Sequence, residues 1–126
     1  MSLKEIAVDG CTLEFQNGGN NESILITGTT STKVKADGKA VYKELKFSIS
    51  GYNGQAITNS DGTGQGSIIA TAQHVKVEGN AVILKGDTSA LITINGSTTT
   101  QSGKQDVTAM EIVKVTDAGQ TKVKGA

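Results

Sequence analysis

The chain has 126 residues, with 12 basic and 12 acidic side chains and a formal net charge of +0. This length favours one domain spanning residues 1–126, because folding at this size buries roughly two-thirds of the unfolded chain's surface. Every basic residue is Lys, and a neutral chain without Arg argues against a nucleic-acid partner, which would select a basic face with bidentate Arg contacts. Aromatic residues are only 3% of the chain, which argues against a stacking surface for bases or sugars.

The N-terminal residues and the single cysteine bear on where the chain is made. Met1-Ser2-Leu3-Lys4-Glu5 lacks the basic-then-apolar pattern of a secretory signal peptide. No apolar run in the sequence approaches the ~18 residues of a membrane span. Cys11 has no second cysteine to pair with, so the chain does not need an oxidising compartment. We therefore expect synthesis in the cytoplasm without a signal peptide, and no membrane anchoring.

In chain order, apolar residues alternate with polar ones at period two, and helical periodicity is nearly absent. β-branched residues dominate these runs, which is typical of half-buried strands. In Lys33–Ala36 the lysines fall on one face and the apolar residues on the other, which predicts a sheet with one solvated side. Gly103–Met110 is the one segment that could hold a helical turn. The class is therefore all-β, with strands expected at Ser23–Thr27, Lys33–Ala36, Lys46–Ser50, His74–Glu78, Ala90–Ile94 and Glu111–Val115.

Acidic residues followed by Gly separate several of the short alternating runs. An Asp-Gly pair supplies the positive φ angles that a type I′ hairpin turn needs at both central positions. We therefore expect structural hairpin turns at Asp9, Gly10, Asp37, Gly38, Glu78 and Gly79.

Two longer polar segments, Tyr52–Gly66 and Ser97–Gly103, are rich in Gly, Asn, Ser, Thr and Gln. This composition buries little apolar surface, so both segments are expected to be surface loops. Gly62–Gly66 superficially resembles a phosphate-binding loop, but it lacks the Lys-Ser/Thr pair and the helix that hold the anion. The sequence therefore favours a flexible loop over a phosphate site.

An internal repeat is the most informative feature of the sequence. Thr30–Val41 and Thr71–Val82 align without a gap and share one Thr, two Val, one Lys, the turn Gly and one Ala. Ile6–Leu13 is a weaker copy, and Val113–Gly119 is a degraded fourth one. A hairpin unit used three or more times suggests a pseudo-symmetric domain whose apolar faces meet on an internal axis. Chance similarity between hairpins is the alternative interpretation.

The chemistry-bearing residues do not suggest an enzyme. His74 aligns with Lys33 in the repeat, so we expect it to face solvent; a catalytic set would need a nucleophile beside it and a carboxylate such as Asp87. Cys11 is expected to be a small buried thiol. One Cys and one His cannot complete a four-ligand zinc site within one chain, so no metal and no cofactor are expected.

With the repeat established, the sequence resembles the PAAR-like proteins. The resemblance rests on Val8-Asp9-Gly10-Cys11-Thr12-Leu13, on Gly18-Gly19 followed by Ser23-Ile24-Leu25-Ile26, and on the repeated Val-Lys-x-Asp/Glu-Gly-x-Ala-Val unit. It implies a small β-rich cone or prism that sits on the trimeric β-helical spike of a contractile injection machine, such as a phage tail or a type VI secretion system. The metal-binding His and Cys set of that family is not present here.

Two functions of different classes follow. The first is a structural tip that caps a trimeric spike, helps puncture the target envelope and is assembled into a virion tail or secretion particle, with an effector as a further partner. The second is a non-enzymatic binding module of a fibre, an adhesin or a capsid decoration protein. In that case the segments Tyr52–Gly66 and Ser97–Gly103 would carry out recognition.

Overall fold

A computed structural model describes residues 3–126; Met1 and Ser2, which open the N-terminal segment considered above, lie outside the described residues. The all-β class is confirmed, since the helical structure in the described residues is the short 3-10 turn η1 (Asn21–Ser23). The strands are β1 (Lys4–Glu5), β2 (Thr12–Phe15), β3 (Ile24–Ala36), β4 (Lys39–Gly54), β5 (Ile57–Ser67), β6 (Lys76–Val77), β7 (Asn80–Ala81), β8 (Ile92–Thr100), β9 (Gly103–Glu111), β10 (Val113–Asp117) and β11 (Lys124–Gly125).

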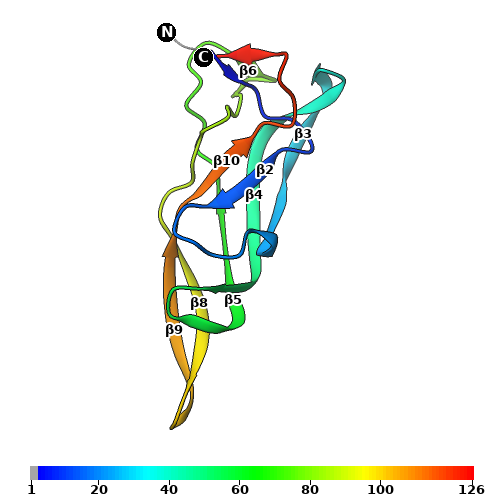
Figure 1. The fold of residues 1–126 in the computed structure, drawn as a ribbon. Coiled ribbons are helices and arrows are strands. Elements are labelled where there is room, and N and C mark those ends of the chain that lie inside the picture. The colour runs from blue at the N-terminus through cyan, green and yellow to red at the C-terminus, as the bar shows by residue number, and fades with distance from the viewer. Residues whose placement is uncertain (1–2) are drawn as a thin grey trace.

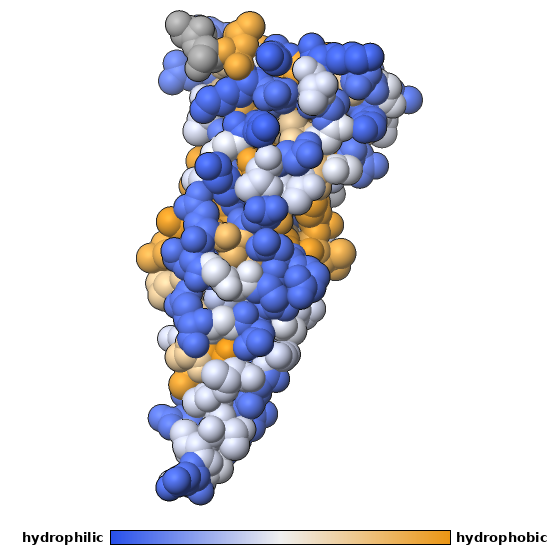
Figure 2. Space-filling model, viewed as in Figure 1, coloured by the Kyte–Doolittle hydropathy of each residue, from blue (hydrophilic) through white to orange (hydrophobic). Residues whose placement is uncertain are grey.

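The long strands form one antiparallel sheet in the order β3-β4-β5-β8-β9. Three two-stranded sheets, β1-β11, β2-β10 and β6-β7, complete the fold. The molecule is elongated: both termini and β6 lie at one end, and the β8–β9 hairpin projects at the other (Figure 1). The space-filling view shows that the molecule tapers from a broad end to a narrow end (Figure 2).

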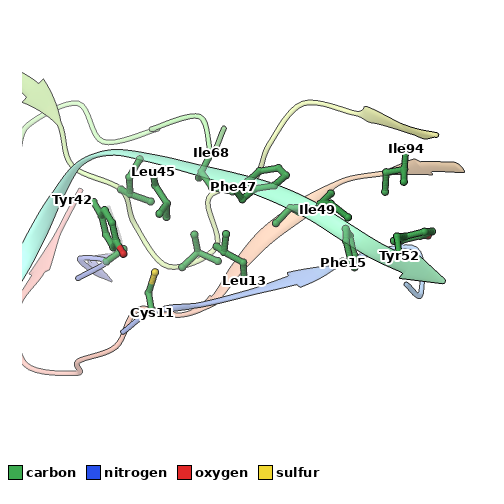
Figure 3. Close-up of a cluster of buried hydrophobic side chains, with 14 of the residues drawn as sticks. Cys11, Leu13, Phe15, Tyr42, Leu45, Phe47, Ile49, Tyr52, Ile68 and Ile94 are labelled. Atoms are coloured by element: carbon green, nitrogen blue, oxygen red, sulfur yellow. The ribbon is translucent and has the colours of Figure 1, made fainter. Parts of the chain in front are cut away.

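Two apolar clusters stabilise this shape. The larger one lies between β2 and the long sheet, where Leu13 and Phe15 face Leu45, Phe47 and Ile49 of β4 (Figure 3). These side chains alternate along their strands, as a strand with one buried face requires. Each fully buried side chain of this size stabilises the fold by about 1.5–3 kcal/mol relative to an exposed one. A second cluster is built from Ile6, Val8, Ala36, Val41, Ala72, Val77, Val82 and Leu84.

Gly103–Met110, the one segment in which a helical turn was possible, belongs to strand β9 instead. It pairs with β8 without interruption from Ile92↔Glu111 to Thr100↔Gly103. Its side chains alternate only weakly in hydropathy, since most of β9 is exposed on both faces. The hydrogen-bond ladder to β8, rather than local amphipathicity, therefore determines its conformation.

The loop expected at Tyr52–Gly66 is also wrong, because most of the segment belongs to β4 and β5. Its glycines are packing positions: a Cβ on Gly62 would lie 2.7 Å from the Tyr52 Cβ, and one on Gly66 would lie 2.8 Å from the Phe47 ring. Glycine lets the strand approach these aromatic side chains closely. Likewise, most of the loop expected at Ser97–Gly103 continues the strands β8 and β9 on either side of a tight turn.

Two of the expected strands differ in detail. Lys33–Ala36 lies within β3, but Val34 is 40% exposed rather than buried. The β3–β4 register shifts between Thr30 and Lys35, and the Ser31 hydroxyl oxygen accepts hydrogen bonds from the amides of Lys33 (3.0 Å) and Val34 (2.9 Å). This local turn breaks the expected alternation. In the expected strand His74–Glu78, only the two residues of β6 belong to a strand.

Candidate functional site

Two matching hairpin turns shape the broad end of the molecule. Asp37 (φ 53°) and Gly38 (φ 78°) connect β3 to β4, and Glu78 (φ 48°) and Gly79 (φ 83°) connect β6 to β7. Positive φ at both central residues is the signature of a type I′ turn. The pairing is equivalent as well, with Lys35↔Ala40 in the first hairpin and Lys76↔Ala81 in the second.

The Asp9–Gly10 turn differs from these two hairpins. Gly10 has a φ of 98°, whereas Asp9 is not among the residues with positive φ. The Cys11 amide donates to the Val8 carbonyl over 3.0 Å, which closes a four-residue turn of the kind that needs Gly at its third position. The Asp9 amide donates to the Ala40 carbonyl over 2.9 Å and so ties this turn to the first hairpin.

The three turns share one apolar base. Val8, Ala36 and Val77 each precede a turn by one residue, and all three are buried in the second cluster. The sequence repeat therefore corresponds to a local structural likeness. The structure does not show a pseudo-symmetric domain, however. The proposed fourth copy, Val113–Gly119, forms β10 against β2 instead of a hairpin of its own.

We call the exposed turn residues Asp9, Gly10, Asp37, Gly38, Glu78 and Gly79 the turn surface. Two of its carboxylates have lysine partners: Lys122 Nζ lies 3.7 Å from Asp37 Oδ1, and Lys43 Nζ lies 3.9 Å from Glu78 Oε2. Exposed ion pairs of this kind contribute about 0–1 kcal/mol each. They nearly neutralise the turn surface, so a partner would recognise its shape and backbone more than its charge.

The residues considered for catalysis are not assembled into a reactive site. Asp87 is buried and accepts hydrogen bonds from the amides of Leu84 (2.9 Å) and Thr71 (3.3 Å) and from the Thr71 hydroxyl. His74 is exposed, and its amide donates to the Ala126 carbonyl over 2.9 Å. Cys11 is buried, and burial with the nearby Asp9 charge raises the pKa of its thiol to about 11. At neutral pH this thiol stays protonated and is a poor nucleophile.

A buried carboxylate was not singled out from the sequence. Glu111 is 0% exposed and accepts hydrogen bonds from the Asn17 amide (2.8 Å), the Gly19 amide (3.1 Å) and the Tyr52 hydroxyl. It thereby fastens the loop after β2 to the sheet. The signal was present in the sequence, because period-two alternation places Glu111 on the same face as Val113 and Val115, both buried.

The narrow end carries a polar network between the two segments expected to be loops. Asn59 Nδ2 donates to Ser97 Oγ (2.9 Å), and Thr99 Oγ1 donates to Asn59 Oδ1 (3.1 Å). Asp61 accepts from the Ser97 amide (2.9 Å) and the Ser97 hydroxyl, and Lys104 Nζ lies 3.7 Å away. The Ser97 hydroxyl is the main cause that holds the pKa of Asp61 below its ordinary value. Hydrogen bonds between hydroxyl, amide and carboxylate groups thus join the two segments, with Ser97 buried among them.

Within residues 3–126, no three His, Cys, Asp or Glu side chains gather closely enough to hold a metal ion. Among the same residues, no helix is long and apolar enough to cross a membrane. No protein-family model, curated protein or solved structure matches this chain. The family resemblance noted in the sequence therefore remains a prediction.

Proposed function

We propose that this chain is a structural tip protein that caps the trimeric β-helical spike of a contractile injection machine. The observation that carries the proposal is the tapered all-β shape, with turns over an apolar cluster at the broad end and a bare β-hairpin at the narrow end (Figures 1 and 2). In this proposal the turn surface contacts the spike and the β8–β9 hairpin points toward the target envelope.

The make-up of the two ends supports these roles. The turn surface is close to neutral and rests on buried Val8, Ala36 and Val77, so it offers a firm platform to a partner. The narrow end has an uninterrupted antiparallel ladder and side-chain hydrogen bonds in place of an apolar core. A puncturing role needs such rigidity and no reactive groups. The protonated thiol of Cys11 and the isolated position of His74 are compatible with it.

The test is the native mass of the complex that an affinity-tagged chain draws from its source cells. One copy of this chain on three copies of a larger β-rich protein supports the proposal. Asp9→Arg places a bulky cation on the turn surface at a residue with ordinary φ, and should reduce recovery of the spike at least about tenfold. Ser102→Arg, at the exposed turn of the narrow end, is the matched control and should leave recovery unchanged. Equal recovery with both variants would contradict the proposed orientation.

A second candidate function is favoured by the polar network of the narrow end. The exposed side chains of Thr58, Asn59 and Thr99, with the half-buried Thr98 between them, form a polar surface over the buried Ser97 that a fibre, adhesin or capsid decoration protein could use for recognition. Deleting Tyr52–Gly66 cannot test this role, because Tyr52 is buried and its removal would disrupt the core. Thr58→Arg combined with Thr98→Arg is the sharper test, since Thr58 is exposed and Thr98 is partly exposed. Loss of ligand binding with retained spike recovery would favour this second function.

A further inference from the structure

One edge of the long sheet has no strand beside it in the described part of the chain. This edge is β3, and its first nine residues, Ile24–Thr32, include neither a charged residue nor proline. Leu25 is 64% exposed there. Natural proteins usually protect such edges with charges, proline or a covering segment, because an unprotected edge pairs with other strands.

The pairing pattern shows which backbone groups of β3 point outward. The Ile68 amide donates to the Leu45 carbonyl over 2.9 Å, so the backbone of Leu45 is directed toward β5. Its partner across β3 is Gly28, whose N–H and C=O groups therefore point away from β4. Because backbone direction alternates along a strand, Ile26 and Ile24 also direct their carbonyl groups outward. The Ile24 amide is already bonded to the Asn21 carbonyl.

The opposite edge of the sheet, β9, is protected. It carries the charges of Lys104 and Asp106. Gln55 covers its end with two side-chain bonds: Nε2 donates to the Met110 carbonyl (2.7 Å), and Oε1 accepts from the Met110 amide (3.2 Å). The contrast between the two edges indicates that β3 is left open for a partner strand.

We propose that β3 pairs with β3 of a second copy of this chain, antiparallel and centred on Ile26. In that register Ile24 lies opposite Gly28 of the other copy, and Leu25 lies opposite Thr27. Gly28 has no side chain to collide with Ile24. The outward-pointing backbone groups of Ile26 form a hydrogen-bonded pair with those of Ile26 in the other copy, across the two-fold axis. In this register only residue 26 faces its own copy, and the paired positions 24–28 and 25–27 carry no charge either, so two copies of this edge meet without repulsion between like charges.

This pairing concerns the free chain and does not rest on the proposed function. Size-exclusion chromatography with light scattering should give the mass of two chains. The L25K/T27K variant adds lysines to two exposed side chains of the edge, so its fold should persist while like charges face each other across the axis. We expect its dimer dissociation constant to rise about tenfold or more. The L25K/T27E variant should restore the dimer, because this register places residue 25 opposite residue 27.

The matched control is T108K/M110K, which puts two lysines at the same spacing on exposed residues of β9 and should leave the dimer intact. Amide hydrogen exchange gives a second readout, since the Ile26 and Gly28 amides should be protected in the dimer and exchange rapidly in L25K/T27K. A monomeric wild-type chain would overturn the proposal. So would a dimer insensitive to L25K/T27K, or an L25K/T27E variant that dimerises no better than L25K/T27K.

Discussion

The hydrogen bond between Tyr52 and Glu111 provides the most direct test of what fastens the loop after β2 to the long sheet. Tyr52 is 0% exposed, and its ring packs edge-on against Phe15, with ring centroids 5.0 Å apart and an interplanar angle of 87°. Tyr52→Phe keeps this packing and removes only the hydroxyl that donates to Glu111. A hydrogen bond to a charged group contributes about 1.5–3 kcal/mol, and we expect a loss of unfolding free energy of that size.

Glu111→Gln tests the same network by changing the acceptor instead of the donor. The Glu111 Oε2 atom accepts from both the Gly19 amide and the Tyr52 hydroxyl. A glutamine NH₂ group in this position can donate to the tyrosine oxygen but faces the Gly19 N–H, which is left without an acceptor. The expected cost is about 1–3 kcal/mol. Because both substitutions break one network, the double variant should lose less stability than the sum of the two single ones by about 0.5–3 kcal/mol.

Urea unfolding followed by circular dichroism measures these differences. Tyr42→Phe is the control: Tyr42 is also buried, but its hydroxyl, unlike that of Tyr52, does not donate to a carboxylate in the described part of the chain. Burial, and then the Glu111 carboxylate, raises the pKa of Tyr52 above its ordinary value of 10.0. The stability that this hydroxyl provides is therefore complete below pH 10.0 and is lost as the pH rises further, so the gap between wild type and Tyr52→Phe should narrow there. Additive single and double variants, or a Tyr42→Phe cost equal to that of Tyr52→Phe, would refute the reasoning.

Three further predictions concern Gly119, which lies against the Asp9–Gly10 turn, Cys11 and the narrow end. Gly119→Ala should lower the free energy of unfolding in urea by about 2–4 kcal/mol, because a Cβ there lies 3.0 Å from the Cys11 amide nitrogen. Gly10 has a similar φ but open space around it, so Gly10→Ala should lower the free energy of unfolding by about 1 kcal/mol. The pKa of Cys11 is raised from 9.0 to about 11, so stability should fall between those pH values, and Cys11→Ala should remove that part of the fall. The pKa of Asp61 is lowered from 3.8, so its contribution is present above pH 3.8 and lost as the pH falls. The protection factor of the Ser97 amide, its exchange rate relative to the intrinsic rate at the same pH, should then fall, as it should in Asp61→Ala at neutral pH.

Local patterns predicted the parts of the fold that depend on neighbouring residues. Alternating β-branched residues identified the strand class, and the core of β4 lies where Lys46–Ser50 alternates. The acidic-Gly pairs at Asp37 and Glu78 fall in turns because the following glycine adopts positive φ without strain, and the short side chain of Asp37 tolerates it as well. At Asp9 the same pair forms a different turn, since its backbone is bonded to the Ala40 carbonyl rather than to a hairpin of its own.

Long-range contacts determine the features that the sequence did not predict. Gly62, Gly64 and Gly66 have a loop-like composition, yet they form a strand because β4 and β8 flank them on both sides. The hydroxyl group that donates to Glu111 belongs to Tyr52, which lies 59 positions away in the sequence. Periodicity within a strand does not predict the pairing of Tyr52 with Glu111. A carboxylate on an apolar face does indicate that a hydrogen-bond donor is buried beside it.

The distribution of polar groups links the fold to the proposed function. Outside the narrow end, the fold is stabilised by the two apolar clusters, so single polar substitutions on the surface there should change the free energy of unfolding little. The narrow end lacks such a core, and its order depends on the β8–β9 ladder and on Asp61, which bonds both the amide and the hydroxyl of Ser97. If the narrow end must stay rigid while it enters an envelope, Asp61→Ala should impair that step and leave spike binding unchanged. A variant that loses both would instead show that the two ends do not act separately.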